Sequence, residues 1–117
     1  MTEFPCLEVP PGATATVYMI DTTVTIDNIP FGRLLEPPVA GLAKTPMLAT
    51  YAFMVENQDG RKVLLDLGAR KDLQTLAPAV RNVLSTVEWV AKVEKNVLEI
   101  LQENGYRDTD FEAIIWR

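Results

Sequence analysis

The chain has 117 residues and a mass of 13.0 kDa, which predicts a single domain with a modest hydrophobic core. Its hydrophobic fraction of 48% and charged fraction of 23% are those of an ordinary soluble globular protein. The net charge of −5 and the scattered basic residues argue against a nucleic-acid surface, because phosphate binding needs a concentrated positive patch.

The amino terminus and the cysteine content bear on the compartment. No apolar run approaches the roughly 20 residues that span a bilayer. Residues 1–12 lack the positive and apolar segments of a secretory signal. Cys6 is the only cysteine, which excludes an internal disulfide and fits a reducing compartment. We therefore expect a cytoplasmic protein without membrane partners.

The chain opens with an irregular arm followed by a strand. Residues 1–12 hold three prolines and one glycine, and we expect the domain itself at 13–117. From Ala13 to Asp27 the sequence is rich in Thr, Val and Ile, and β-branched residues at a spacing of two favour a half-buried strand. Asp21 and Thr22 interrupt the pattern, which predicts either two strands or one bent strand.

Residues 28–47 predict a long irregular loop. They contain four prolines and two glycines, and proline removes a ladder donor and restricts the residue before it. The favoured interpretation is a proline-stiffened excursion over the surface. Because loops of this length are often functional, the alternative is a substrate-flanking loop with apolar contacts from Phe31, Leu34 and Leu35.

The stretch Leu48–Gly68 predicts a β-hairpin. Two apolar runs flank Asn57-Gln58-Asp59-Gly60, and Asp-Gly tolerates the positive φ of a tight connection. Both runs are apolar at nearly every position, so we expect strands that are covered on both faces. The second run ends in Asp66-Leu67-Gly68, a carboxylate and a flexible residue at the carboxyl end of a strand.

Two helices are predicted after the hairpin. Leu73–Ser85 predicts a short helix that is broken by Pro78. Val90–Glu103 predicts a clearer helix, because apolar residues recur three and four positions apart. This helix is expected to end at Gly105, which suits a left-handed cap.

The last segment, Phe111–Trp116, predicts a buried strand, and Trp89 and Trp116 are core candidates. The order strand, helix, strand implies an α/β or α+β domain in which a helix packs on the face of a sheet.

The ordered combination of these pieces resembles a known family. The hairpin ending in L-L-D-L-G, the helix ending in N-G-Y and the segment D-x-D-F-E-A-I-I together resemble the N-terminal portion of the metallo-β-lactamase superfamily, in its lactonase and lactamase-like hydrolase branch. The resemblance implies a partial αββα sandwich, with an N-terminal mixed sheet and one or two helices. In the whole enzyme, zinc hydroxide would attack a lactone, lactam or similar ester-like carbonyl.

The resemblance also implies what this chain lacks. The family's H-x-H-x-D-H zinc motif is expected after Ile115, where only Trp116 and Arg117 follow, and the chain contains no histidine. Without histidine there is no Ser-His-Asp or Cys-His relay, and one cysteine cannot build a thiolate zinc site. We therefore expect no catalytic, cofactor-binding or metal-binding residue in this chain and no bound cofactor, although zinc serves the family that it resembles.

Carboxylates remain as candidates. The resemblance implies that Asp66, followed by Gly68, steadies a metal-binding loop without binding the metal. The favoured interpretation is that Asp66 caps its own turn through local hydrogen bonds. Asp108, Asp110 and Glu112 fall short of the six or more oxygen ligands of a hard cation, so a solvated loop is favoured there.

Two interpretations of function follow. The first is a truncated hydrolase without independent catalysis, whose uncovered sheet face associates with itself or with a complementary chain. The alternative is a complete, small, non-enzymatic α+β binding module that stays a compact monomer and binds through the proline-rich loop and the sheet edges.

Overall fold

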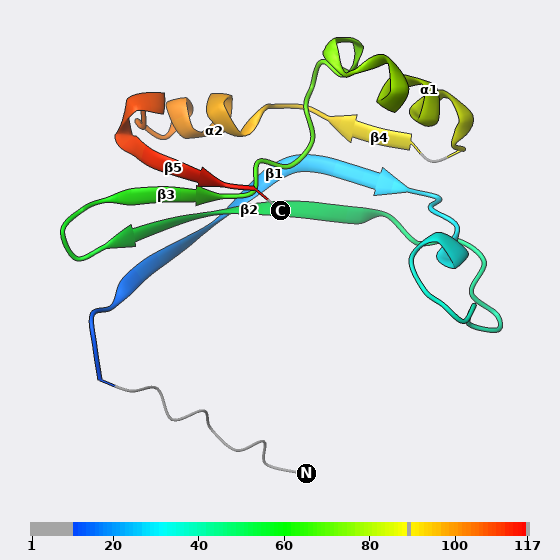
Figure 1. Ribbon diagram of the computed structural model, residues 1–117, viewed down its shortest axis with the longest axis horizontal. Helices are drawn as coiled ribbons and strands as arrows, with labels where there is room; N and C mark the ends of the chain where they lie inside the picture. Colours follow the sequence, from blue (N-terminus) through cyan, green and yellow to red (C-terminus); the bar gives the residue numbers. More distant parts are fainter. Residues whose placement is uncertain (1–10, 89, 117) are drawn as a thin grey trace.

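The computed structural model describes residues 11–88 and 90–116, which form one mixed sheet and two α-helices (Figure 1). The strands are β1 (Ala15–Asp27), β2 (Leu48–Asn57), β3 (Lys62–Leu65), β4 (Val90–Val93) and β5 (Phe111–Ile115), and the helices are α1 (Pro78–Thr86) and α2 (Val97–Glu103). The five strands run in the order β4-β1-β2-β3-β5, and β3 and β5 are parallel. The predicted α+β class, with a mixed sheet and two helices, is confirmed.

β1 is one bent strand. It pairs antiparallel with β2 as far as Asp21, and its register shifts between Asp21 and Thr25. Thr23, inside the shift, has a φ of 57°, a left-handed conformation that is uncommon outside glycine. Beyond the shift the strand also pairs with β4, so the bend lets one strand serve two neighbours. The bent-strand alternative was the correct one.

β2 and β3 form the predicted hairpin. Gly60 has a φ of 78°, as the Asp-Gly signal predicted. The Asn57 side chain accepts hydrogen bonds from the backbone N–H groups of Asp59 (3.0 Å) and Arg61 (2.9 Å), which fixes the turn. This turn sets the register of the two strands, with Val55 opposite Val63 and Phe53 opposite Leu65.

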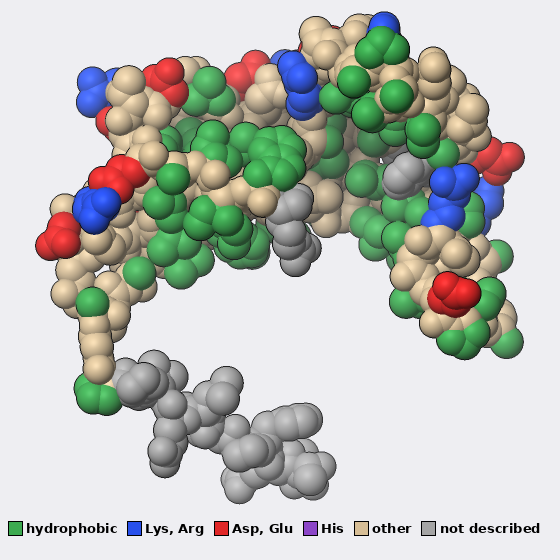
Figure 2. Space-filling model, in the orientation of Figure 1, with side chains coloured by type: hydrophobic (Ala, Val, Ile, Leu, Met, Phe, Trp, Pro, Cys, Tyr) green, Lys and Arg blue, Asp and Glu red, His purple; other side chains and the backbone are tan. Residues whose placement is uncertain are grey.

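The prediction that both faces of this hairpin are covered is wrong for the described residues. On one face α2 packs its buried Val97 and Leu101 against the sheet; the sheet side of this core is Ile20, Ala52, Met54 and Leu64. On the other face the side chains of alternate hairpin residues stay partly accessible, for example Tyr51 (44% exposed) and Leu65 (36%). In Figure 1 both helices lie on the same side of the sheet, and Figure 2 shows hydrophobic side chains gathered over the strands below them.

The helix predicted over Val90–Glu103 is wrong in its first half. Residues Val90–Val93 form β4, which pairs with β1 beyond the bend, because strand pairing supplies backbone partners to this segment and its two valines favour a strand. The helix begins only after Asn96, whose side chain accepts from the N–H of Glu99 while the Glu99 carboxylate accepts from the N–H of Asn96. This reciprocal capping box fixes the start of α2.

The other helix ends follow local chemistry. α1 starts at Pro78 rather than being broken by it, because proline is favoured in the first helical turn, where its missing N–H is not needed. At the end of α2, Gly105 has a φ of 86° and Tyr106 donates its N–H to the Leu101 carbonyl (3.0 Å). The predicted glycine cap is confirmed.

β5 is a strand as predicted, but it is not buried. It forms an edge of the sheet, and Ile114 and Ile115 are each about half exposed. Trp116 is 66% exposed, so the expectation of a core tryptophan is wrong there. Trp89, Cys6 and most of the arm at residues 1–12 lie outside the described residues.

The predicted loop at residues 28–47 contains a single 3-10 turn, Phe31–Arg33, and closes on itself. Thr45 donates its N–H to the Ile29 carbonyl (2.8 Å), and the Thr45 hydroxyl accepts from the Ile29 N–H (3.2 Å). Ile29 and Thr45 are both buried, so the base of the loop is packed. Among the described residues, no helix is long and apolar enough to cross a membrane.

Candidate functional site

The turn after β3 brings the two sequence-predicted site residues together. Asp66 and Gly68 both have a φ of 64°, in the left-handed region that asparagine, aspartate and glycine adopt most readily. The Asp66 carboxylate accepts a hydrogen bond from the N–H of Leu67 (2.9 Å), within its own turn. The Asp66 N–H donates to the Ile115 carbonyl (2.9 Å), which ties the turn to the end of β5.

Gly68 presses against β1. A Cβ added at Gly68 would lie 2.9 Å from the Cβ of Thr22, closer than real side chains come. Thr22 is buried, and its hydroxyl donates to the Thr50 carbonyl (2.8 Å) and lies 2.6 Å from the Thr50 hydroxyl. Since both threonines are fixed between β1 and β2, only a residue without a side chain fits above them. The turn is therefore docked rigidly on the sheet.

A groove opens between this turn, α2 and β5. Its volume is about 780 Å³, within the range of small-molecule sites. The walls are mainly apolar, from Leu64, Leu67, Val97, Leu101, Phe111 and Ile114, and a few polar residues also line it, among them Arg70, Asp72, Asn96 and Asp108. An adjoining groove of about 520 Å³ shares Gly68, Ala69, Arg70 and Trp116 with the first. Such a surface can hold an apolar group, and the carboxylates of Asp72 and Asp108 are among its few polar groups.

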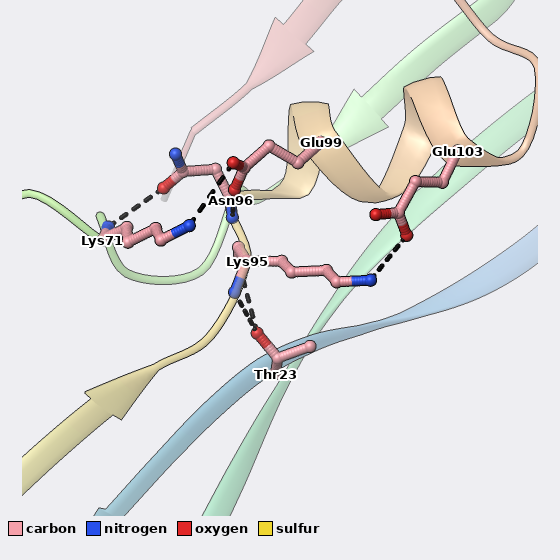
Figure 3. Close-up of polar contacts among 6 residues, drawn as sticks. All are labelled: Thr23, Lys71, Lys95, Asn96, Glu99 and Glu103. Carbon is pink, nitrogen blue, oxygen red and sulfur yellow. Dashed lines mark hydrogen bonds and ion pairs between the residues drawn. The ribbon is translucent and has the colours of Figure 1, made fainter.

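Polar contacts around the start of α2 fix one wall of the groove (Figure 3). The N–H of Lys71 donates to the Asn96 side chain (3.0 Å), which joins the segment after the turn to the helix. The N–H of Lys95 donates to the Thr23 hydroxyl (2.8 Å), which joins the helix to the bend of β1. The wall is thus anchored at two places that are far apart in sequence.

The charged residues around the start of α2 are paired. The N–H of Asn96, 2.7 Å from the Glu99 carboxylate, lowers the pKa of Glu99, with a further contribution from the Lys71 ammonium. The Glu103 carboxylate, 2.7 Å from the Lys95 ammonium, raises the pKa of Lys95. A carboxylate with a lowered pKa is a poor proton acceptor near neutral pH, so Glu99 supports structure rather than proton transfer.

Two of the acidic residues before and in β5 are paired in the same way, while the Asp108 carboxylate accepts only from the N–H of Thr109 (2.9 Å) among the contacts of the described residues. The N–H and guanidinium of Arg107 lower the pKa of Asp110, and the Arg61 guanidinium lowers the pKa of Glu112 through two contacts of 2.7 Å. Across residues 11–88 and 90–116, no three His, Cys, Asp or Glu side chains come together to hold a metal ion.

The loop at residues 28–47 is not brought to the groove. None of its residues lines either groove, and Leu34 and Leu35 are about half exposed. Sequence reasoning instead missed Asn96, Lys71 and the apolar groove residues of α2 and β5. The pattern Asn96-x-x-Glu99 was the available signal, since it is a capping box. Nothing in the sequence pointed to the contact between Lys71 and Asn96.

Comparison with known proteins finds partial relatives. Gamma-lactamase FDB1 of Fusarium pseudograminearum (strain CS3096) is 32% identical over 109 residues, which cover 89% of this chain and 26% of that protein. Cytochrome P450 monooxygenase mpaDE of Penicillium roqueforti (strain FM164) is 34% identical over 117 residues, covering 96% of this chain and 13% of that protein. Cytochrome P450 monooxygenase mpaDE' of Penicillium brevicompactum is 32% identical with the same coverage.

The chain therefore spans about a quarter of the lactamase and about an eighth of the monooxygenases. The same segment recurs in proteins named for two different chemistries. No family model matches the chain, and no solved structure does.

Proposed function

We propose that this chain is the opening sheet of a lactamase-like hydrolase of the metallo-β-lactamase type and does not hydrolyse a substrate by itself. The observation that carries the proposal is the similarity to gamma-lactamase FDB1, which extends over 89% of this chain but only 26% of that protein. In this proposal the matched segment, about a quarter of such a hydrolase, serves as a scaffold, and the rest of the hydrolase supplies the reacting groups. The complete fold would hydrolyse a lactam, a lactone or a related ester-like bond.

The donor atoms of this chain support a scaffold role. Protein zinc sites take three or four ligands from Cys, His, Asp and Glu side chains. The chain has no histidine and one cysteine, and within its described part no three such side chains converge. The residues present do not fit a zinc ion, so the ligands of a zinc hydrolase would come from the rest of the fold.

In that fold, Asp66 would act as a positioning residue. Its carboxylate accepts a hydrogen bond from the N–H of Leu67, and its own N–H donates to the Ile115 carbonyl at the end of β5. The docked turn would give the neighbouring catalytic segment a fixed support.

The test uses the part of gamma-lactamase FDB1 that lies outside the matched segment, produced as a separate polypeptide. Mixed with this chain, it is expected to co-elute, to retain zinc and to hydrolyse a gamma-lactam. This chain alone is expected neither to retain zinc nor to hydrolyse the lactam. The matched segment of FDB1, mixed with the same polypeptide, is the positive control. Co-elution and activity in the control but not with this chain would contradict the proposal. One or two zinc ions retained by this chain alone would also contradict it.

A second candidate function rests on the groove beside α2. Its volume of about 780 Å³ and its apolar walls with a few polar residues are typical of a small-molecule site. In this interpretation the chain is a non-enzymatic binding module. A compact monomer that binds an environment-sensitive apolar dye, with binding weakened by Leu98→Asp at the groove wall, would favour this candidate over the first.

A further inference from the structure

The sheet face opposite α2, here called the open face, carries two apolar rows. Cross-strand partners share a face, so the strand register defines each row. The first row runs across four strands as Met19, Phe53, Leu65 and Ile115. The second runs parallel to it as Val17, Val55, Val63 and Ala113. Neither row contains a charged or polar side chain.

The described residues leave the open face accessible. Val17 is 60% exposed, Met19 66% and Ile115 52%, although all three lie within strands. Both helices lie on the other side of the sheet in Figure 1. Monomeric proteins rarely leave a contiguous apolar patch of this kind in contact with water, and larger ones mark interaction sites.

We infer that the open face pairs with the open face of a second copy of this chain. Two sheets pack face to face at about 10 Å with their strands nearly aligned, and apolar rows suit this packing. A two-fold axis brings the same surface to both partners, so the face must tolerate its own copy. Two rows without charge meet this condition, because no like charges are brought together despite the net charge of −5.

Charged groups near the face leave this contact free. The Glu56–Lys62 pair lies on the α2 side, because Glu56 alternates with Val55 along β2. Asp21 lies on the same face two residues beyond Met19 along β1, opposite Tyr51, and its carboxylate accepts a hydrogen bond from the N–H of Thr23 (2.9 Å). Asp21 is therefore placed at the rim of the pairing, where it stays hydrated.

The inference rests on the proposed function, since the remainder of a hydrolase fold would cover the same face and would exclude the second copy. The dimer is then the state of the chain when that remainder is absent. Dimer formation covers the two apolar rows, which would otherwise remain exposed and lead to open-ended association.

The test measures the mass of the full chain by light scattering after size-exclusion chromatography, across the micromolar range. A concentration-dependent dimer is expected. Val17→Lys places one ammonium from each copy in the dimer interface. It is expected to raise the dimer Kd at least about thirtyfold. Val83→Lys, at a residue of α1 that is 55% exposed, is the matched control and is expected to leave the Kd unchanged.

The outcomes separate this inference from the proposed function. A monomer at every concentration, or a dimer that survives both Val17→Lys and Met19→Lys, would overturn the inference. Far-UV circular dichroism checks that both variants are folded, as expected for positions that are exposed in the single chain. A dimer that yields to these variants but never exchanges for the remainder of FDB1 would support the inference and contradict the proposed function.

Discussion

The two faces of the sheet are built from the same strands but differ in what covers them. On one face, alternate residues such as Ala52, Met54 and Leu64 are sealed beneath α2. On the other, their immediate neighbours Tyr51 and Leu65 remain accessible, at 44% and 36%. Both sets of residues are apolar, so hydrophobic composition alone did not decide burial. The position of one short helix, fixed by its capping box and by its contact with the bend of β1, decided it.

Truncation of two neighbouring leucines tests most directly whether the two faces differ in burial. Leu64→Ala removes a buried side chain and is expected to lower the free energy of unfolding by about 2–5 kcal/mol. Leu65→Ala removes a partly exposed side chain and is expected to cost less than about 1 kcal/mol in the monomer. Urea denaturation at a concentration below the dimer Kd measures both. Equal losses would mean that the open face is covered within a single chain.

The docked turn offers the next largest effect. Gly68→Ala forces a Cβ against Thr22 and keeps a residue with a side chain at a φ of 64°, so we expect a loss of about 1–3 kcal/mol. Gly105→Ala also meets a positive φ, of 86°, but no atom lies within 4 Å of its added Cβ. A loss of about 1 kcal/mol is expected there. If thermal unfolding showed the same loss for both, the close approach of the turn to β1 would contribute nothing.

The α2 cap should make stability depend on pH. Because the folded pKa of Glu99 is lowered from 4.5, its ionised form stabilises the fold above that value, and this stabilisation disappears as the pH falls through the folded pKa. Glu99→Gln is expected to flatten the decline in stability between about pH 6 and about pH 3. Urea titrations at each pH measure the slope. Glu94→Gln, outside the cap, is the control, and an unchanged slope in Glu99→Gln would refute the assignment.

The smallest effect is expected at Asp66. Asparagine also adopts the left-handed conformation, and its side-chain oxygen can accept the same hydrogen bond from Leu67. Asp66→Asn should therefore change the stability of this chain by less than about 0.5 kcal/mol. A larger loss in denaturation, with Asp66→Ala no worse, would show that the negative charge itself is required.

Most of the fold could be predicted where the signal is local. Asp59-Gly60 fixed the hairpin, Gly105 fixed the end of α2, and the interrupted Thr-Val-Ile pattern fixed the bend of β1. Each of these rests on backbone preferences of one or two residues. Such preferences act within a few residues and survive in any tertiary setting.

The failures are those that depend on distant partners. Val90–Val93 fit a helical stripe equally well, and only pairing with β1 made this segment a strand. The continuous apolar runs of β2 and β3 predicted that both faces of these strands are covered. Whether a face is covered depends on which distant segments pack against it. The groove beside α2 joins residues from the hairpin, the turn, the helix and β5, and no local pattern describes such a meeting.

The loop between β1 and β2 has a practical consequence. Its base is closed by the buried pair Ile29 and Thr45, while the side chains of Leu35 and Leu42 are exposed. It contributes to neither groove, and it lies outside both apolar rows. Exposed loop tips with a closed base tolerate insertions well. The tip at residues 35–42 is thus a suitable place for a short affinity tag or a fluorescent label, so that the chain can be captured or followed while both faces of its sheet stay free.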